Sequence, residues 1–460
     1  MDFVHTIADF IHRHSLLRKD GMYLVALSGG ADSVAMMLAL QQLGYRIEAA
    51  HCNFRLRGEE SDRDESFCKK LCHDRGIPFH LVHFDTRAYA ALHQVSIEMA
   101  ARDLRYPYFE HLRKDIQADG ICVAHHRDDS VETVLMNLIR GTGIHGLTGI
   151  APQNGYVLRP LLCVSRNEIL AFLSSIHQDF VTDSTNLVDD VTRNKIRLDV
   201  LPLLETINPS VKENIAKTAD RIGESVKMVD HVLDDAKARL LQETVKGRRK
   251  VYSVDIGLLQ QEISPEYTLF YLLKDFSFSS AQIEQIASHL DAPTGTMWHS
   301  ANYDLLLDRG KILWMAQEPV SSLKMRIPEE GTYRYQEGKP QEGNSLRFQF
   351  KKVAIDDKFS LVKDQAWATL DADKVTFPLT IRHLQEGDRF IPFGMRGSRL
   401  VSDFLTDRKY SLFEKQAQLV ITDAHDYILW LVGLRPDARY CIKDGSRRAL
   451  TIHVTDEPVE

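Results

Sequence analysis

Six small and polar residues at positions 28 to 33, SGGADS, carry the clearest chemical signal in this sequence. They follow an apolar run, 22 to 27, that is too short for a typical helix and too continuous for a half-exposed strand, which predicts a strand buried on both faces. Residues 33 to 40 are mostly apolar and predict a buried helix. A strand, a glycine turn and a helix N-terminus direct unpaired N–H groups and the helix dipole at one point. The stretch therefore predicts an anion site.

The loop does not match the common nucleotide-binding pattern of the Walker type. That pattern requires Gly-Lys-Ser or Gly-Lys-Thr after the first glycine, and neither tripeptide occurs in the sequence. An anion bound here would have to be held without the Walker lysine. The alternative interpretation is purely structural: a tight strand-to-helix turn in which Ser33 serves as a cap.

Two carboxylates follow another predicted strand, 121 to 124. Asp129 and Glu132 are three residues apart, so both face one cleft if a helix begins near Ser130. Carboxylate oxygens are ligands that Mg²⁺ prefers, although acids at a helix start are also easily solvated. His125 lies directly after the strand and is either a phosphate-site residue or a structural histidine.

Arginines form two further candidate groups. Arg105 shares a face of the predicted helix 96 to 106 with Glu98 and Arg102, where a surface ion pair is the simpler interpretation. Arg193 and Arg197 are four residues apart, a spacing that suits an anion clamp but is also common in solvent-exposed charge.

A parallel sheet would bring these residues together, because ligands of open α/β sheets bind beyond the carboxyl ends of the strands. His51 and Asn53 lie at the end of one predicted strand. They could line a nucleotide pocket, or they could lie in a surface loop. We predict a doubly wound N-terminal sheet with strands at 22–27, 46–53, 79–84, 121–124 and 156–159.

The rest of the chain has a different pattern. Apolar residues recur at helical spacing from 211 to 240 and predict the long helix of a mainly helical middle domain, with a hairpin near 298–304 and 311–315. Residues 329 to 344 are polar and rich in glycine, proline and glutamine, which predicts a linker or long hairpin. A small α+β domain follows. The predicted domains are therefore 1–207, 208–330 and 345–460.

Composition limits the class of protein. The chain has 460 residues, a net charge of −7, no apolar run long enough for a membrane span and six cysteines without a dense framework, which predicts a cytoplasmic protein. The acidic balance argues against indiscriminate nucleic-acid binding. Between 382 and 448, however, twelve basic residues stand against nine acidic ones, a local charge of +3.

The SGGADS loop resembles the SGGxDS pyrophosphate loop of N-type ATP pyrophosphatases, which have an adenine nucleotide alpha hydrolase-like fold. More specifically, five further motifs in order resemble the tRNA(Ile)-lysidine synthetase family. They are ExAARxxRY at 98–106, AHHRDDSVET with GTGIHGL at 124–147, RPLL at 159–162, DSTN at 183–186, and RNKIR at 193–197 with Pro202.

This resemblance implies a two-step reaction. ATP adenylates the wobble cytidine of tRNA(Ile) with a CAU anticodon and releases pyrophosphate; free L-lysine then displaces AMP. The residues implied to bind ATP are Ser28, Gly29, Gly30, Ala31, Asp32, Ser33, His51 and His125. Those implied in catalysis are Asp32, Asp129, Glu132, Arg105 and Arg197, with Asp32 and Asp129 as the Mg²⁺ ligands and the two acids Asp129 and Glu132 receiving the lysine amine. Which acid is the base is left open, as is a homodimer.

The C-terminal part resembles the acceptor-stem-binding domain of the longer lysidine synthetases through GDRFIPFG and ILWLVGLR. The resemblance makes Arg389, Arg396, Arg399 and Arg408 candidates for tRNA contact. The match is looser here, since Glu414, Lys415 and Gln416 stand where many members carry an arginine.

Two other functions stay open at this point. A tRNA-thiolating ATP pyrophosphatase would share the loop, but those enzymes depend on paired cysteines or a CxxC-bound cluster, and the sequence has no CxxC. A non-catalytic ATP-binding protein that binds RNA would also share the loop, and would release no AMP.

Overall fold

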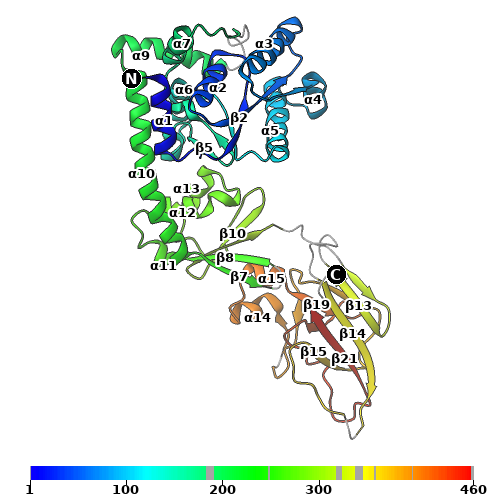
Figure 1. Ribbon diagram of the computed structural model, residues 1–460. Helices are drawn as coiled ribbons and strands as arrows, with labels where there is room; N and C mark the ends of the chain where they lie inside the picture. Colours follow the sequence, from blue (N-terminus) through cyan, green and yellow to red (C-terminus); the bar gives the residue numbers. More distant parts are fainter. Residues whose placement is uncertain are drawn as a thin grey trace. The chain divides into compact units, whose positions relative to one another are not determined.

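The computed structural model describes residues 2–182, 191–246, 249–317, 324–336, 345–356, 359–395 and 397–456. The chain forms two compact units, Met1–Asp230 and His231–Glu460 (Figure 1). Residues 183–186 of the DSTN motif, residues 337–344 of the predicted linker, and Arg396 lie outside the described residues. Within the described part, no helix is both long and apolar enough to cross a membrane.

The first unit contains a six-stranded sheet in the order β3-β2-β1-β4-β6-β5. All neighbours are parallel except the short pair β5 and β6, so the predicted doubly wound parallel sheet is confirmed. The strand bounds agree with the prediction to within a few residues. The strands are β1 (Met22–Ala26), β2 (Arg46–Asn53), β3 (Phe79–His83), β4 (Gly120–Cys122), β5 (Gln153–Asn154) and β6 (Val157–Leu158).

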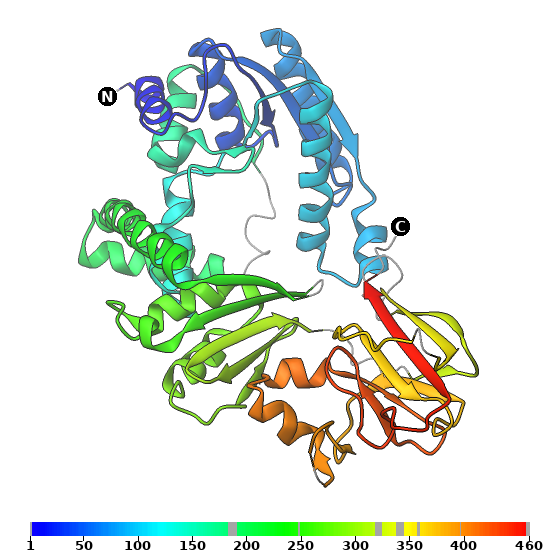
Figure 2. The same cartoon turned by 90° about the horizontal axis from the view of Figure 1, so that it is seen from below.

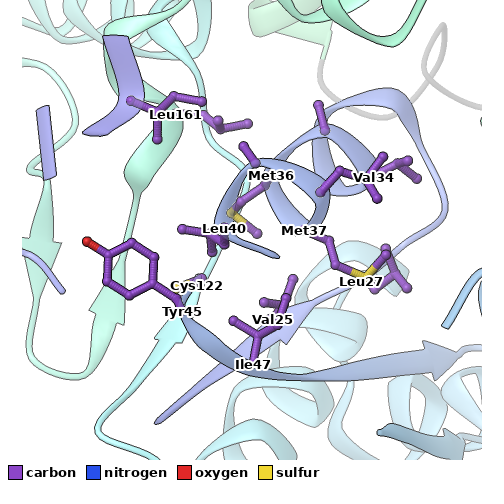
Figure 3. Packing of buried hydrophobic residues seen from close by; sticks show 14 of the residues in the cluster. Val25, Leu27, Val34, Met36, Met37, Leu40, Tyr45, Ile47, Cys122 and Leu161 are labelled. Atoms are coloured by element: carbon purple, nitrogen blue, oxygen red, sulfur yellow. The ribbon is translucent and has the colours of Figure 1, made fainter. Parts of the chain in front are cut away.

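Helices cover both faces of this sheet. On one face, α2 contributes nine buried residues, and Figure 3 shows its Met37 and Leu40 packed near Val25 and Ile47 of the strands. On the other face, Phe109 of α5 packs against Leu24 of β1. The helices of this unit are α1 (Phe3–Arg13), α2 (Ala31–Gln42), α3 (Glu59–Arg75), α4 (Thr86–His93), α5 (Ile97–Asp115), α6 (Arg127–Arg140), α7 (Arg166–Ser175), α8 (Val191–Lys195) and α9 (Leu201–Ile207), with the short turns η1 (Ile144–Thr148), η2 (Pro160–Cys163) and η3 (Ile196–Val200).

Two helices begin earlier than the sequence indicates. The helix after the glycine loop starts at Ala31, with Gly30 as its N-cap, so Asp32 lies in the first helical turn. The helix α6 starts at Arg127 and not near Ser130, because the backbone N–H of its N-cap, His126, is bound by the Asp129 carboxylate. Both shifts move predicted site residues onto helix N-termini, where anionic groups are stabilised.

The long helix α10 (Val211–Leu240) is present as predicted. In the second unit α11 (Ile256–Leu259), α12 (Pro265–Leu273), the turn η4 (Lys274–Phe276) and α13 (Ser280–Ser288) follow, and the structure adds a five-stranded antiparallel sheet of which the sequence indicated only the hairpin. Its order is β7-β8-β11-β10-β9, formed by β7 (Gln242–Lys246), β8 (Arg249–Asp255), β9 (Met297–His299), β10 (Tyr303–Asp308) and β11 (Lys311–Ala316).

The C-terminal part is an α+β structure, as predicted. In both views β21, drawn in red, lies beside β14, with which it pairs (Figure 2). The two main sheets have the orders β12-β16-β19-β20 and β13-β14-β21-β15, and β17 pairs with β18. The elements are β12 (Met325–Ile327), β13 (Gly331–Gln336), β14 (Ser345–Ala354), β15 (Trp367–Asp371), β16 (Leu379–His383), β17 (Arg389–Phe390), β18 (Arg399–Leu400), α14 (Val401–Asp407), α15 (Leu412–Gln416), β19 (Leu419–Thr422), β20 (Ile428–Leu431) and β21 (Arg448–Asp456).

Candidate active site

The glycine loop between β1 and α2 is held in shape by its own hydrogen bonds. The Ser33 hydroxyl donates to the Gly30 carbonyl at 3.0 Å and accepts the Ser28 N–H at 3.2 Å. Gly29 has φ +91°, and a Cβ there would lie 3.1 Å from the Cys68 sulfur, so both conformation and space require glycine. Its carbonyl accepts the N–H of Val181. The loop therefore keeps its conformation through internal contacts. Ser33 stabilises the loop in this way but is not the cap that the structural interpretation expected, because the N-cap of α2 is Gly30.

A cavity of about 410 Å³ opens beside this loop at the carboxyl ends of the strands. Its lining combines the polar loop with apolar residues of the strands. Arg105 and Tyr106 of α5 reach into it, with the Arg105 guanidinium 5.0 Å from the ring centre of Phe54. The lining residues are Ala26, Leu27, Ser28, Gly30, Asp32, Ser33, Ala50, Cys52, Phe54, Arg105, Tyr106, Phe109, Val123, Ala124 and His125. A planar base against the apolar residues and phosphates at the loop would match this lining.

His51 is not among the residues that line the cavity, contrary to its predicted place in the nucleotide pocket. Side chains alternate along a strand, so Ala50 and Cys52 of β2 face the cavity while His51 points to the other side. There its ring is buried and its Nδ1 donates to the Leu27 carbonyl at 2.8 Å. Asn53 is also buried, and its amide donates to Glu65. Both residues support the strand ends beneath the loop.

Burial lowers the pKa of His51, which predicts a pH-dependent contribution to stability. Because its folded pKa lies below the unfolded value of about 6.5, this contribution is complete above that pH and is lost as pH falls through the folded pKa. Asparagine can donate the same hydrogen bond and does not titrate. We expect the melting temperature of His51→Asn to decline less between pH 7 and pH 5 than that of the wild type. Parallel declines would contradict this role.

Two carboxylates flank the buried imidazole of His126. Its Nε2 lies 3.9 Å from Oδ1 of Asp32 and 3.5 Å from Oδ2 of Asp129. The Asp32 Oδ1 atom is buried and has no hydrogen-bond partner among the residues that the structure describes. An unpartnered carboxylate oxygen near a second carboxylate suits a divalent cation, and Mg²⁺ in such sites takes one or two carboxylates and completes its shell with phosphate oxygens and water. Within the described ranges, no group of three or more His, Cys, Asp or Glu side chains could hold a metal ion.

The Glu132 side chain is enclosed by arginines. It is 1 % exposed, and both its oxygens accept hydrogen bonds from Arg197, at 2.6 and 2.9 Å. Arg193 Nε lies 3.4 Å from the same carboxylate, and Arg197 Nη2 lies 3.6 Å from Asp129. The structure therefore brings together the predicted acids and the predicted arginine pair, and it shows that Glu132 is already neutralised by them.

An unusual helical turn places Arg197 in this cluster. Residues 196–200 form a π-turn between α8 and α9, in which the N–H of Leu201 bonds to the Ile196 carbonyl, five residues back. Pro202 follows and has no N–H to continue an α-helical pattern. π-turns inside helices are frequent at functional sites. The proline therefore helps to maintain the wide turn that carries Arg197.

Replacing Pro202 by alanine restores a backbone donor and a strong helix former, so we expect equal or higher thermal stability. If the turn relaxes toward α-helix, Arg197 shifts relative to Glu132, and misplacements of about 1 Å can cost on the order of a hundredfold in rate. We expect a higher KM for lysine and slower lysine incorporation into tRNA. Pro265→Ala, at the start of α12, is the matched control and should change neither. Unaltered lysine kinetics in Pro202→Ala would contradict this role of the turn.

His125 lines the cavity and accepts a hydrogen bond at Nδ1 from Arg159 Nε, at 3.3 Å. Its pKa is lowered to about 4, mainly by burial and with smaller contributions from Arg159 and Arg193, against an opposing effect of Asp129. The imidazole is therefore neutral near pH 7. It can bind a phosphate only as a hydrogen-bond donor through Nε2 and not as a cation.

Two residues beside the loop were not predicted. Arg166, the first residue of α7, places Nη1 2.7 Å from Oδ2 of Asp32, and His126 lies between the acids as described above. A basic residue at a helix N-terminus opposes the helix dipole, and this could have marked Arg166 in the sequence. Nothing in the HHRDD run distinguishes the buried His126 from its neighbour His125.

The predicted tRNA-contacting arginines differ in their surroundings. Arg389 is exposed on β17. Arg399 forms an ion pair with Asp407, and the Arg408 guanidinium stacks over the ring of Phe404, 4.4 Å from its centre. The buried Arg382, counted in the basic excess, is bound by Asp388 and Asp426 inside the domain. The excess of positive charge is thus partly used within the fold.

Comparison with known proteins gives the family of the chain. Residues 2–204 match the family of the PP-loop domain, and residues 247–315 match the TilS substrate binding domain. A tRNA(Ile)-lysidine synthase of Parabacteroides distasonis is 44 % identical over 98 % of this chain and 99 % of its own length. The tRNA(Ile)-lysidine synthases of Bacteroides thetaiotaomicron and Porphyromonas gingivalis W83 are 44 % and 35 % identical, over 96 % and 95 % of this chain and 97 % and 95 % of their own lengths. This chain therefore belongs to the tRNA(Ile)-lysidine synthase family.

Proposed function

We propose that this protein ligates lysine to the wobble cytidine of tRNA(Ile) with a CAU anticodon, with release of pyrophosphate and AMP. The observation that carries the proposal is the acid and arginine cluster that lies next to a preformed phosphate loop, in a chain that shares its family over nearly its full length. ATP binding follows from the PP-loop domain, and tRNA binding from the TilS substrate binding domain.

In the first step, the ring carbonyl oxygen of the cytidine attacks the α-phosphorus of ATP, and the bond to the β-phosphate breaks. The backbone of residues 28–31 receives the departing phosphates, which the helix dipole of α2 also stabilises. The N–H groups of Ser28 and Gly30, which donate to the hydroxyls of Ser33 and Ser28 within the loop, would exchange those bonds for phosphate oxygens. Asp32 and Asp129 would hold Mg²⁺, which supplies positive charge against the triphosphate when bound. The adenylated base then carries AMP as a good leaving group.

In the second step, the ε-amine of lysine attacks the activated ring carbon and AMP departs. Both Asp129 and Glu132 were predicted to receive the amine. We propose that Asp129 binds the ammonium and takes its proton, because Glu132 is saturated by Arg197 and Arg193. Glu132 would then act by holding Arg197, whose guanidinium faces the lysine carboxylate or the phosphate of the adenylate. Arg105, which lines the cavity, is the second cationic partner.

The cysteines argue against the thiolation alternative. Burial raises the pKa of Cys52, which lines the cavity, to about 12. A sulfur-transferring cysteine needs a lowered pKa to be a thiolate near neutral pH. The remaining five cysteines also have raised pKa values through burial. Ligation through an amine requires none of them.

The other parts of the chain are assigned within the same proposal. Residues 1–207 perform the chemistry, 208–330 bind the tRNA body, and 345–460 bind the acceptor stem through Arg389, Arg399 and Arg408. A basic segment that binds RNA would make affinity fall with rising salt. A cytoplasmic location and a homodimer stay predictions.

The test is a reaction with ATP, labelled lysine and a tRNA(Ile) transcript with the CAU anticodon. We expect label in the RNA and equal amounts of AMP and pyrophosphate. Methionine tRNA with the same anticodon is the matched control and should accept no lysine. Formation of ADP would contradict the proposal, and retention of ATP without turnover would favour a non-catalytic ATP-binding protein.

A further inference from the structure

A guanidinium lies against the phosphate loop. Arg166 pairs with Asp32 at 2.7 Å, and its backbone N–H is fixed by the Asp128 carboxylate at 2.9 Å. Its side chain is 46 % exposed, whereas α7, which carries it, packs against α2. The main chain of Arg166 is thus anchored, and its side chain is free to exchange partners.

The loop lacks a cation of its own. Pyrophosphate carries several negative charges, and SGGADS supplies backbone N–H groups without the Walker lysine. Two other arginines near the site have committed partners, since Arg197 is bound by Glu132 and Arg159 by His125, and Arg105 lies over the ring of Phe54. The partner of Arg166 is different, because Asp32 has a second oxygen that no described residue binds by a hydrogen bond, and Asp32 is itself a candidate ligand for a cation.

We infer that Arg166 binds the pyrophosphate portion of ATP, and that its ion pair with Asp32 is exchanged when ATP and Mg²⁺ bind together. In the free protein the guanidinium neutralises Asp32. In the complex Asp32 turns to the metal and Arg166 to the phosphate oxygens, which guanidinium groups bind in a bidentate manner. Partly exposed ion pairs contribute little to stability, so the exchange is easily reversed. The inference rests on the proposed function.

Arg166→Gln tests it in the full chain, with Arg166→Lys as the charge-conserving variant. Arg18→Gln is the matched control, because Arg18 forms a similar exposed pair with Asp119 at 2.8 Å, at the amino end of β1. Pyrophosphate binding is measured by calorimetry in the presence of Mg²⁺. Cation binding is measured separately, without nucleotide, by paramagnetic resonance with Mn²⁺.

We expect Arg166→Gln to weaken pyrophosphate binding by about tenfold to a hundredfold, the range for a lost charge-assisted contact, and Arg166→Lys to weaken it less. Binding of Mn²⁺ should stay equal or become tighter, because Asp32 loses its competing partner. Pyrophosphate affinity equal to that of the wild type in Arg166→Gln would overturn the inference, and so would parallel loss of both ligands, which indicates a structural pair. Failure of the wild type to bind pyrophosphate would overturn the proposed function as well.

Discussion

Asp32→Asn should abolish pyrophosphate release from ATP in the presence of tRNA. The substitution keeps the size of the side chain and removes the charge that faces the cation and Arg166. A bound metal stabilises developing phosphate charge by several kcal/mol, so we expect a loss of about a thousandfold or more. The measurement is pyrophosphate formed in a single turnover without lysine, which isolates the adenylation step.

The matched control is Asp62→Asn, an acid in the first turn of α3. Asp62 also lies at a helix N-terminus, and its Oδ1 is 3.4 Å from the Asn53 amide. Asp62 is not among the residues that line the cavity. We expect adenylation within a few-fold of the wild type. A variant at Asp32 that still releases pyrophosphate at the wild-type rate would show that this carboxylate does not hold the metal.

How much of this site was predictable depends on the range of the interactions. The loop and β1 were predicted because the information is local: an apolar run, two glycines and an apolar helix are read from adjacent residues. The pairing of Glu132 with Arg197 joins residues 65 positions apart. From the sequence, both were predicted to be site residues, but their pairing with each other was not predicted. This pairing changes the role of Glu132.

The direction in which a side chain points was a second limit on what could be predicted from the sequence. His51 was predicted to face the nucleotide because it ends a strand, but the two sides of a strand alternate, and a shift of one position exchanges them. Arg166 was missed for a related reason, since its role depends on how closely α7 packs on α2. The π-turn at 196–200 could have been suspected from Pro202, but the sequence does not fix where the extra residue is accommodated.

Glu132→Gln should block the second step while leaving the first in place. Glutamine cannot neutralise Arg197, so the guanidinium loses the bidentate partner that orients it. We expect lysine incorporation to fall by about a hundredfold, the typical effect of misplacing a positioned group, while the single-turnover yield of pyrophosphate stays near the wild-type value. Adenylated tRNA should therefore accumulate, which can be measured as labelled AMP bound to RNA.

Stability provides an independent readout of the same pair. Removing one member of a buried ion pair lowers the free energy of unfolding by about 3–5 kcal/mol. We expect a loss of about 3 kcal/mol or less for Glu132→Gln, because the Arg197 side chain is 38 % exposed. The double variant Glu132→Gln with Arg197→Gln should recover part of this loss without recovering lysine incorporation. Glu110→Gln removes a comparable bidentate pair with Arg113 and is the control for stability alone. If Glu132→Gln impaired both steps equally, Glu132 would have to act on the nucleotide itself, and the separation of roles between Asp129 and Glu132 would be wrong.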